Sequence, residues 1–217
     1  MQNYKTYKSR EEAGKVLAGE LEKLSLQNPY LIAIPRGGIQ VAQAIADRFN
    51  IPINVIVTKK LPVPGSPETG FGAITEDGHR VFNEDYLGYL NLTGAELEEI
   101  CQGVISEIKH RVDVYGSYDK EKIRGADVIV VDDGVATGYS LIAALMNVRS
   151  YNPKSVIAAV PVCSAGAYQK IKANADTVVC PIVDSGTFFA VGYFYEDFSN
   201  LSEAEIQKIL KKYRKDS

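Results

Sequence analysis

Two adjacent carboxylates, Asp132 and Asp133, directly follow the apolar run 128–131 and precede a turn of small residues. The run is β-branched throughout, which suits a strand buried on both faces. The acidic pair therefore lies where the strand leaves the sheet, at the edge where open α/β sheets bind ligands. Paired carboxylates at that edge can accept hydrogen bonds from sugar hydroxyls.

The turn after the acidic pair combines small residues with two hydroxyl side chains and leads into the expected helix 140–149. Its glycines allow a tight turn that brings backbone N–H groups close to a ligand. N–H groups at a helix N-terminus bind phosphate. One peptide therefore offers acceptors for sugar hydroxyls beside donors for a phosphate, which suits a ribose 5-phosphate. The turn consists of Gly134, Val135, Ala136, Thr137, Gly138, Tyr139 and Ser140.

This apolar strand, acidic pair and Ala-Thr-Gly sequence resembles the 5-phosphoribosyl-1-pyrophosphate (PRPP) signature of type I phosphoribosyltransferases. The resemblance implies that Asp132 and Asp133 hold the ribose 2′- and 3′-hydroxyls and that the turn 134–140 holds the 5′-phosphate. The ordinary alternative is a buried strand that ends in an Asp-Asp-Gly turn without a ligand.

A second strand-turn-helix unit contains Pro35, Arg36, Gly37 and Gly38. The glycines allow unusual backbone angles, and Arg36 adds a planar cation that matches phosphate oxygens. The turn resembles the pyrophosphate loop of the same family, which often carries a strained or cis peptide here. The alternative is a plain strand-to-helix turn with a surface arginine.

Lys59 and Lys60 follow the expected strand 53–57, and the Pro- and Gly-rich range 61–80 follows them. The resemblance implies that one of these lysines neutralises the departing pyrophosphate. The sequence leaves open which one, because adjacent strand residues face opposite ways, and two solvated charges are the alternative. The range 61–80 predicts a mobile loop or a short hairpin, and in the family such a segment closes over PRPP as a lid.

The range 188–198 is rich in aromatic residues and resembles the C-terminal hood of purine phosphoribosyltransferases. The resemblance implies that Phe189 stacks on a base, that backbone groups near Ala190 read the base edge, and that Glu196 faces Mg²⁺ through water. A buried edge strand with core aromatics is the alternative. Purine enzymes usually carry a lysine just before the hood, and the range 178–184 has none.

The resemblance implies a glycosyltransferase of the pentosyltransferase class that moves 5-phosphoribosyl from PRPP to a nucleobase-like acceptor and releases pyrophosphate. Asp132 and Asp133 would orient the ribose, while Arg36 with Lys59 or Lys60 would stabilise the leaving group. Mg²⁺ would be held mainly by PRPP oxygens. The nearest rival is a PRPP-binding regulator without turnover. A phospho-receiver domain also uses paired acids, but its pair belongs near the first strand.

Composition bounds the fold and the partners. The chain has 217 residues, of which 46% are hydrophobic, and a formal net charge of -3. This length and composition suit one α/β domain over residues 1–217, without disulfides. The balance of charge predicts no nucleic-acid partner. The sequence has no apolar leader or membrane-length run, so it predicts a cytoplasmic protein without a membrane partner. Family precedent favours a homodimer.

Alternating strands and helices predict an open parallel sheet flanked by helices, with a small hood mainly over 181–200 and a flexible lid loop. Capping boxes at Ser9, Thr93 and Ser202 predict three helix starts. The expected strands are 30–34, 53–57, 127–131, 155–162 and 177–183, and the expected helices begin at residues 10, 39, 94, 140, 165 and 203.

Overall fold

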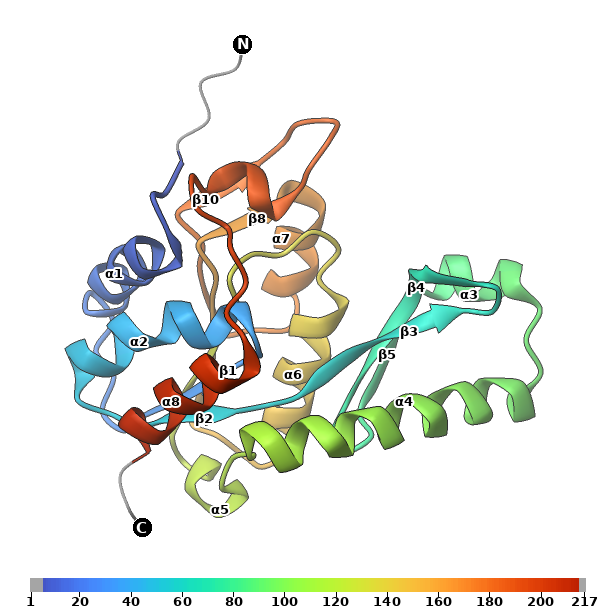
Figure 1. Cartoon of the computed structure of the whole chain (residues 1–217), viewed down its shortest axis with the longest axis horizontal. Helices are drawn as coiled ribbons and strands as arrows, with labels where there is room; N and C mark the ends of the chain where they lie inside the picture. Colours follow the sequence, from blue (N-terminus) through green and yellow to red (C-terminus); the bar gives the residue numbers. More distant parts are fainter. Residues whose placement is uncertain (1–5, 215–217) are drawn as a thin grey trace.

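The computed structural model describes residues 6–214 and contains the expected parallel sheet. Helices cover both of its faces, so the predicted α/β architecture is confirmed (Figure 1). The strands run in the order β2 (Ile53–Val55), β1 (Pro29–Ala33), β6 (Asp127–Val131), β7 (Ser155–Ala159) and β9 (Thr177–Val179).

The strand order changes direction between β1 and β6, which are direct neighbours although they are far apart in the sequence. Their register pairs Ala33 with Val131, so the two strands end at the same level. A reversal of this kind places the turns after the two strands at the switch point where open α/β sheets bind ligands. The turns 34–38 and 132–138 therefore meet there.

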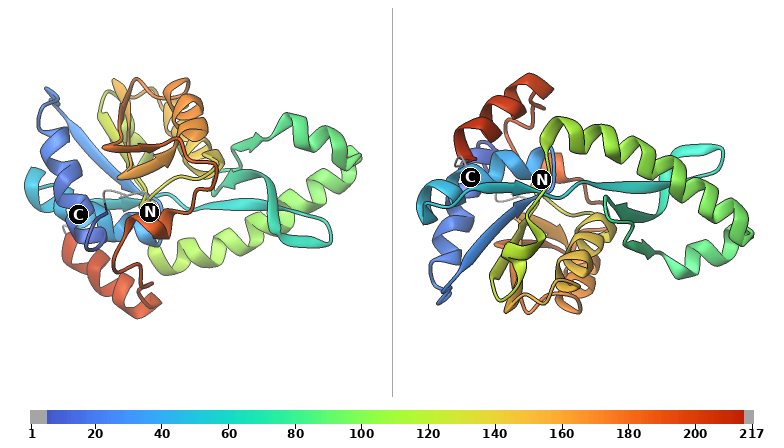
Figure 2. Two further views of the ribbon diagram at one scale, coloured as in Figure 1. Left: turned by 90° about the horizontal axis from the view of Figure 1, so that it is seen from above. Right: turned by 90° about the horizontal axis from the view of Figure 1, so that it is seen from below.

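The sheet is buried on both faces, and β6 shows why its sequence is apolar at every position. Ile129 and Val131 pack in the core that includes α1 (Arg10–Leu21), α2 (Gly37–Phe49) and α8 (Glu203–Tyr213). Val128 and Val130 face the opposite core, beneath α6 (Tyr139–Arg149) and α7 (Ala165–Lys172). Figure 2 shows α8 and the α6–α7 pair on opposite sides in both views.

An arm projects from the sheet to one side (Figures 1 and 2). It consists of an antiparallel sheet, β3 (Thr58–Val63), β4 (Ser66–Thr75) and β5 (Arg80–Phe82), together with α3 (Glu84–Leu90) and α4 (Gly94–Tyr115). The range 61–80 thus forms the hairpin that was one of its two expected forms. The capping box at Thr93 starts α4 as predicted, and the short helix α5 (Lys120–Ile123) leads back to β6.

One predicted strand is shorter in the structure and two are divided, and this changes where some residues lie. The expected strand 53–57 ends at Val55, and β3 starts at Thr58, so Lys59 and Lys60 lie inside a strand of the arm. The other two break at Pro161 and Pro181 into β7 and β8 (Val162–Ser164) and into β9 and β10 (Ile182–Asp184). Proline lacks the N–H that a continuous ladder needs.

The hood combines the parallel pair β8 and β10 with the 3₁₀-helix η1 (Val191–Phe194). An amino-terminal segment that the sequence did not assign to it also takes part, since Tyr7 forms a bridge with Tyr195. Glu196 N–H donates to the Tyr7 carbonyl at 2.8 Å, and Asp197 N–H donates to the Lys8 carbonyl at 3.0 Å. The hood is therefore built from both ends of the chain.

Within residues 6–214, no helix combines the length and apolar character needed to cross a membrane.

Asp127 stabilises the opposite edge of the sheet, and its replacement gives a testable prediction. Its side chain accepts hydrogen bonds from Ser155 Oγ at 2.7 Å and from the N–H groups of Gln27 at 2.9 Å and Asn28 at 3.4 Å. Burial works to raise the pKa of Asp127, but these donors outweigh burial and lower that pKa below its ordinary value. Asp127→Asn should therefore lower the free energy of unfolding by about 2 kcal/mol at pH 7.

Because the folded-state pKa of Asp127 is lowered, its contribution is present above the unfolded pKa of about 4 and is lost as pH falls through the folded value. Urea unfolding should show the gap between wild type and Asp127→Asn closing below about pH 4. Lys154→Met is the control, because its ammonium is half exposed and 3.5 Å from Asp127. An equal loss in both variants would contradict the prediction.

Candidate functional site

The two turns at the switch point approach so closely that only glycine fits between them. A Cβ on Gly37 would collide with the Asp133 carboxylate, and one on Gly38 would lie 2.6 Å from the Val131 carbonyl oxygen. The peptide bond between Pro35 and Arg36 is cis, as the resemblance implied. The two motifs that the sequence singled out separately therefore form one site.

The turn after β6 presents a row of free amides. Gly138 has a φ of 92° and caps α6 without a side-chain hydrogen bond. Within the described residues, the N–H groups of Thr137, Gly138, Tyr139 and Ser140 donate to no protein acceptor. Unsatisfied N–H groups at a helix start form an anion site. Three of these residues line a cavity of about 130 Å³, whose full lining is Asp132, Gly134, Val135, Ala136, Thr137, Gly138, Ser140 and Leu141.

The hood strand β8 holds the turn 134–140, called the amide cradle below, in place. Val135 N–H donates to the Val162 carbonyl at 2.9 Å, and Ser164 N–H donates to the Val135 carbonyl at 3.0 Å. Ser164 Oγ donates to the Ala136 carbonyl at 2.7 Å. These bonds fix the backbone of the turn through the carbonyls of Val135 and Ala136 and leave the N–H groups of residues 137–140 without a partner. The amides are therefore preorganised for an anion.

The two carboxylates differ in their surroundings. Asp132 lines the cradle, and its Oδ1 accepts from Asp133 N–H at 2.8 Å. Burial and the neighbouring Asp133 carboxylate raise the pKa of Asp132 well above its usual range. Asp133 Oδ2 instead accepts from Arg10 Nε at 2.7 Å. The two acids thus differ, because the pKa of Asp132 is raised whereas Asp133 has a cationic partner in Arg10.

Arg10 and Tyr195 are two residues of this site that the sequence did not reveal. The Arg10 side chain is only 3% exposed and also donates from Nη1 to the Ser199 carbonyl at 2.8 Å. Its guanidinium lies 3.9 Å from the centroid of the Phe198 ring. The Tyr195 hydroxyl donates to the Asp133 carbonyl at 2.5 Å. No sequence motif next to Arg10 indicates a binding role, because Arg10 is simply the first residue of a predicted helix.

The expected cations have different neighbours. Arg36 is exposed beside the cradle, and its Nη1 lies 3.5 Å from the Leu201 carbonyl oxygen. Lys59 forms an ion pair with Glu107 of α4, and burial followed by nearby Arg111 lowers its pKa. Lys60 donates to a carbonyl of the hairpin, at Glu68. The structure therefore brings Arg36 to the site and places both lysines on the arm.

The hood aromatics divide into an inward and an outward pair. Phe189 packs on Phe194 with ring centroids 5.5 Å apart, and Ala190 precedes η1. Phe188 and Tyr193 are 69% and 61% exposed, with ring centroids 5.9 Å apart. In this conformation the outward pair offers the free aromatic faces, and Phe189 contributes to the hood core.

The residues present fit a Mg²⁺ that arrives with a phosphorylated substrate. Within residues 6–214, no three His, Cys, Asp or Glu side chains converge as a metal cage. Mg²⁺ is usually bound by substrate phosphates with one or two carboxylates and waters, so no cage is required. Glu196 is exposed at the hood and available for such an indirect contact.

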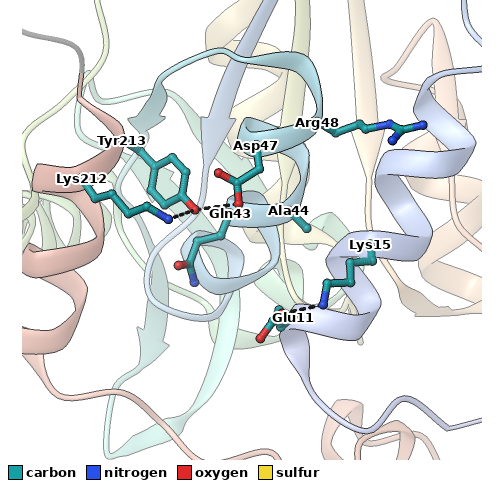
Figure 3. Close-up of a pocket in the computed structure, with 8 residues that line it drawn as sticks. All are labelled: Glu11, Lys15, Gln43, Ala44, Asp47, Arg48, Lys212 and Tyr213. Carbon is teal, nitrogen blue, oxygen red and sulfur yellow. Dashed lines mark hydrogen bonds and ion pairs between the residues drawn. The ribbon is translucent and has the colours of Figure 1, made fainter.

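A larger hollow lies away from the switch point, between α1, α2 and α8 (Figure 3). It has a volume of about 510 Å³, but the charged side chains that line it already have partners: Arg48 pairs with Glu22, and Lys212 donates to the Tyr213 hydroxyl at 2.8 Å. Lys15 pairs with Glu11 at 2.6 Å, and Tyr213 donates to Asp47 at 2.9 Å. Its size alone therefore does not mark it as the candidate site, whereas the unpaired amides distinguish the turn after β6.

Gly37 gives a direct test of the contact between the two turns. Gly37→Ala should lower the free energy of unfolding by about 1–3 kcal/mol, because the new methyl group must displace the Asp133 carboxylate. Gly19→Ala is the matched control: it lies in α1, nothing is within 4 Å of its added Cβ, and alanine should stabilise the helix by about 0.5–1 kcal/mol. Urea unfolding measures both, and an unchanged Gly37→Ala would contradict the described contact.

Two curated relatives match this chain along almost its whole length. They come from strains of Mycobacterium tuberculosis, are named as candidate phosphoribosyl transferases, and are each 34% identical over 213 residues, which is 98% of this chain. That match is 48% of each relative, so this chain spans about half their length.

Solved structures agree with the fold. The crystal structure of a Thermus thermophilus protein is 34% identical with a TM-score of 0.78, covering 96% of this chain and 99% of that one. An Aquifex aeolicus protein shares the fold at 14% identity and a TM-score of 0.53, covering 81% and 73% of the two chains.

The model of one sequence family matches residues 3–197 of this chain. That range includes the turn 34–38, the acidic pair, the amide cradle and most of the hood. With the cradle geometry and the two curated relatives, this match shows that the chain belongs to the phosphoribosyl transferase domain family.

Proposed function

We propose that the chain transfers the 5-phosphoribosyl group of PRPP to a nucleobase-like acceptor and releases pyrophosphate. The observation that carries this proposal is the junction of the two turns, where an acidic pair adjoins a row of unpaired amides. Membership of the family supports the general reaction. The acceptor is assigned only by chemical class.

In this proposal the ribose hydroxyls bind Asp132 and Asp133, and the 5′-phosphate binds the turn 134–140. The pyrophosphate lies on the turn that contains Arg36, Gly37 and Gly38, where the Gly37 N–H and the Arg36 guanidinium meet its charge, while the Gly38 N–H donates to the Ile34 carbonyl at 3.1 Å. The lone pair of an acceptor nitrogen attacks C1 from the opposite face, and the bond from C1 to the pyrophosphate oxygen breaks with its electron pair on pyrophosphate. The proton of the attacking nitrogen passes to solvent. The chain supplies position and charge stabilisation, without a covalent intermediate.

Mg²⁺ bound with PRPP would supply further neutralisation of the pyrophosphate charge, with Glu196 as the proposed indirect ligand. The acceptor would lie under the hood, against Phe189 and the backbone near Ala190. The arm hairpin is the proposed lid, and its closure would bring Lys59 or Lys60 toward the leaving group and exclude water.

A PRPP-binding regulator is the second candidate, because both lysines are engaged on the arm. Calorimetry with PRPP and Mg²⁺, followed by a pyrophosphate-release assay across purine and pyrimidine bases, distinguishes the two. Binding with base-dependent release supports the transferase. Binding without release for any base supports the regulator, and no PRPP binding contradicts both.

A further inference from the structure

Arg10 joins three segments that are far apart in the sequence. Its Nε donates to the Asp133 carboxylate 123 positions away, and its Nη1 donates to the Ser199 carbonyl 189 positions away. The guanidinium also lies over the Phe198 ring, 3.9 Å from its centroid. Buried cations are found where they are paired, and this one has a partner on each side.

The residues that Arg10 contacts belong to the candidate site and the hood, not to a remote part of the core. Asp133 belongs to the acidic pair, and Ser199 and Phe198 follow the hood residue Glu196. The Tyr195 hydroxyl adds a second tie, from the hood to the Asp133 carbonyl. A guanidinium presents its donors in a rigid fork, so a fixed Arg10 fixes both the Asp133 carboxylate and the hood segment at Phe198 and Ser199.

We propose that Arg10 is a positioning residue that clamps the hood onto the acidic pair and orients the Asp133 carboxylate for the ribose hydroxyls. The ribose part of this inference rests on the function proposed above, whereas the clamp itself does not. An ion pair alone would leave Asp133 free to swing between ligand and solvent. The second donor, to Ser199, and the stacking on Phe198 remove that freedom, so ribose meets a carboxylate already in place.

The clamp is tested first without any ligand, by hydrogen exchange. Arg10→Met keeps the side-chain length but removes the charge and the donors. The N–H groups of Glu196 and Asp197, which bond to residues 7 and 8, should then exchange at least tenfold faster than in wild type. Arg48→Met is the matched control, since Arg48 pairs with Glu22 on an exposed surface and should leave that exchange unchanged. Unchanged exchange in Arg10→Met would overturn the clamp.

The ribose role is tested by a double-mutant cycle with Asp133→Asn, measured as PRPP affinity by calorimetry. Arg10→Met should weaken PRPP binding at least tenfold in the wild-type background and less than twofold in the Asp133→Asn background. Equal losses in both backgrounds would mean that Arg10 does not act through Asp133 and would overturn the role. A merely structural arginine would give that equal loss.

Arg10→Lys keeps the cycle decisive if Arg10→Met does not fold. Lysine has no fork to hold Asp133 and Ser199 together, so a loss of at least threefold is expected, again absent in the Asp133→Asn background. If wild type binds no PRPP, the proposed function and the ribose role fall together, while the exchange experiment still decides whether Arg10 clamps the hood.

Discussion

Asp133→Asn is expected to weaken PRPP binding roughly 10- to 100-fold, which corresponds to the loss of one charge-assisted hydrogen bond of about 1.5–3 kcal/mol. The asparagine has the same shape but no charge for the ribose hydroxyls or for Arg10. It can also turn an NH₂ group toward the guanidinium, which has only donors. The affinity loss therefore combines a weaker acceptor with a displaced side chain.

Asp132→Asn is the matched control for this prediction. Asp132 Oδ1 accepts from the Asp133 N–H at 2.8 Å, and the side-chain oxygen of an asparagine can keep that hydrogen bond. Calorimetry with PRPP and with ribose 5-phosphate should show a clearly smaller loss for Asp132→Asn than for Asp133→Asn. A loss of equal size, or none in Asp133→Asn, would contradict the assigned difference between the two acids.

Gly138→Ala should weaken the binding of PRPP and of inorganic phosphate about tenfold or more. Gly138 has a φ of 92°, a conformation that costs an alanine about 1–2 kcal/mol. The new methyl would also lie 3.3 Å from the Ile142 side chain. Relief of that strain rotates the peptide planes on either side of Gly138, so the amides no longer point to one anion.

Gly125→Ala separates backbone strain from phosphate binding. Gly125 also has a positive φ, of 69°, but lies between α5 and β6, at the end of β6 away from the acidic pair, with no atom within 4 Å of an added Cβ. Its alanine variant should lose comparable stability in urea and keep its affinity for phosphate and PRPP. If Gly138→Ala keeps its affinity as well, the cradle is not the phosphate site.

Much of the fold could be predicted because its signals are local. The strand 127–131 has the predicted bounds, since a short run rich in β-branched residues and bounded by polar residues favours a strand over a helix. The capping boxes at Thr93 and Ser202 both begin helices as expected. Breaks at Pro161 and Pro181 were missed, because apolar runs continue on both sides of each proline.

The candidate site was predictable where one peptide carries all its parts, as in the turn 134–140. The residues from other parts of the chain that contact the site could not be predicted. Arg10 has no neighbour in sequence that marks it, and its role depends on contacts with residues far along the chain. The side chains of Lys59 and Phe189 likewise depend on packing against α4 and Phe194, which no short motif encodes.

The arginine at position 10 also has a consequence for the timing of synthesis. A ribosome makes this residue early, yet its hydrogen-bond acceptors at positions 133 and 199 emerge only much later. Domains gain their long-range contacts last, because loop closure must precede them. Arg10 can therefore hold Asp133 and the hood together only after residue 199 has been made.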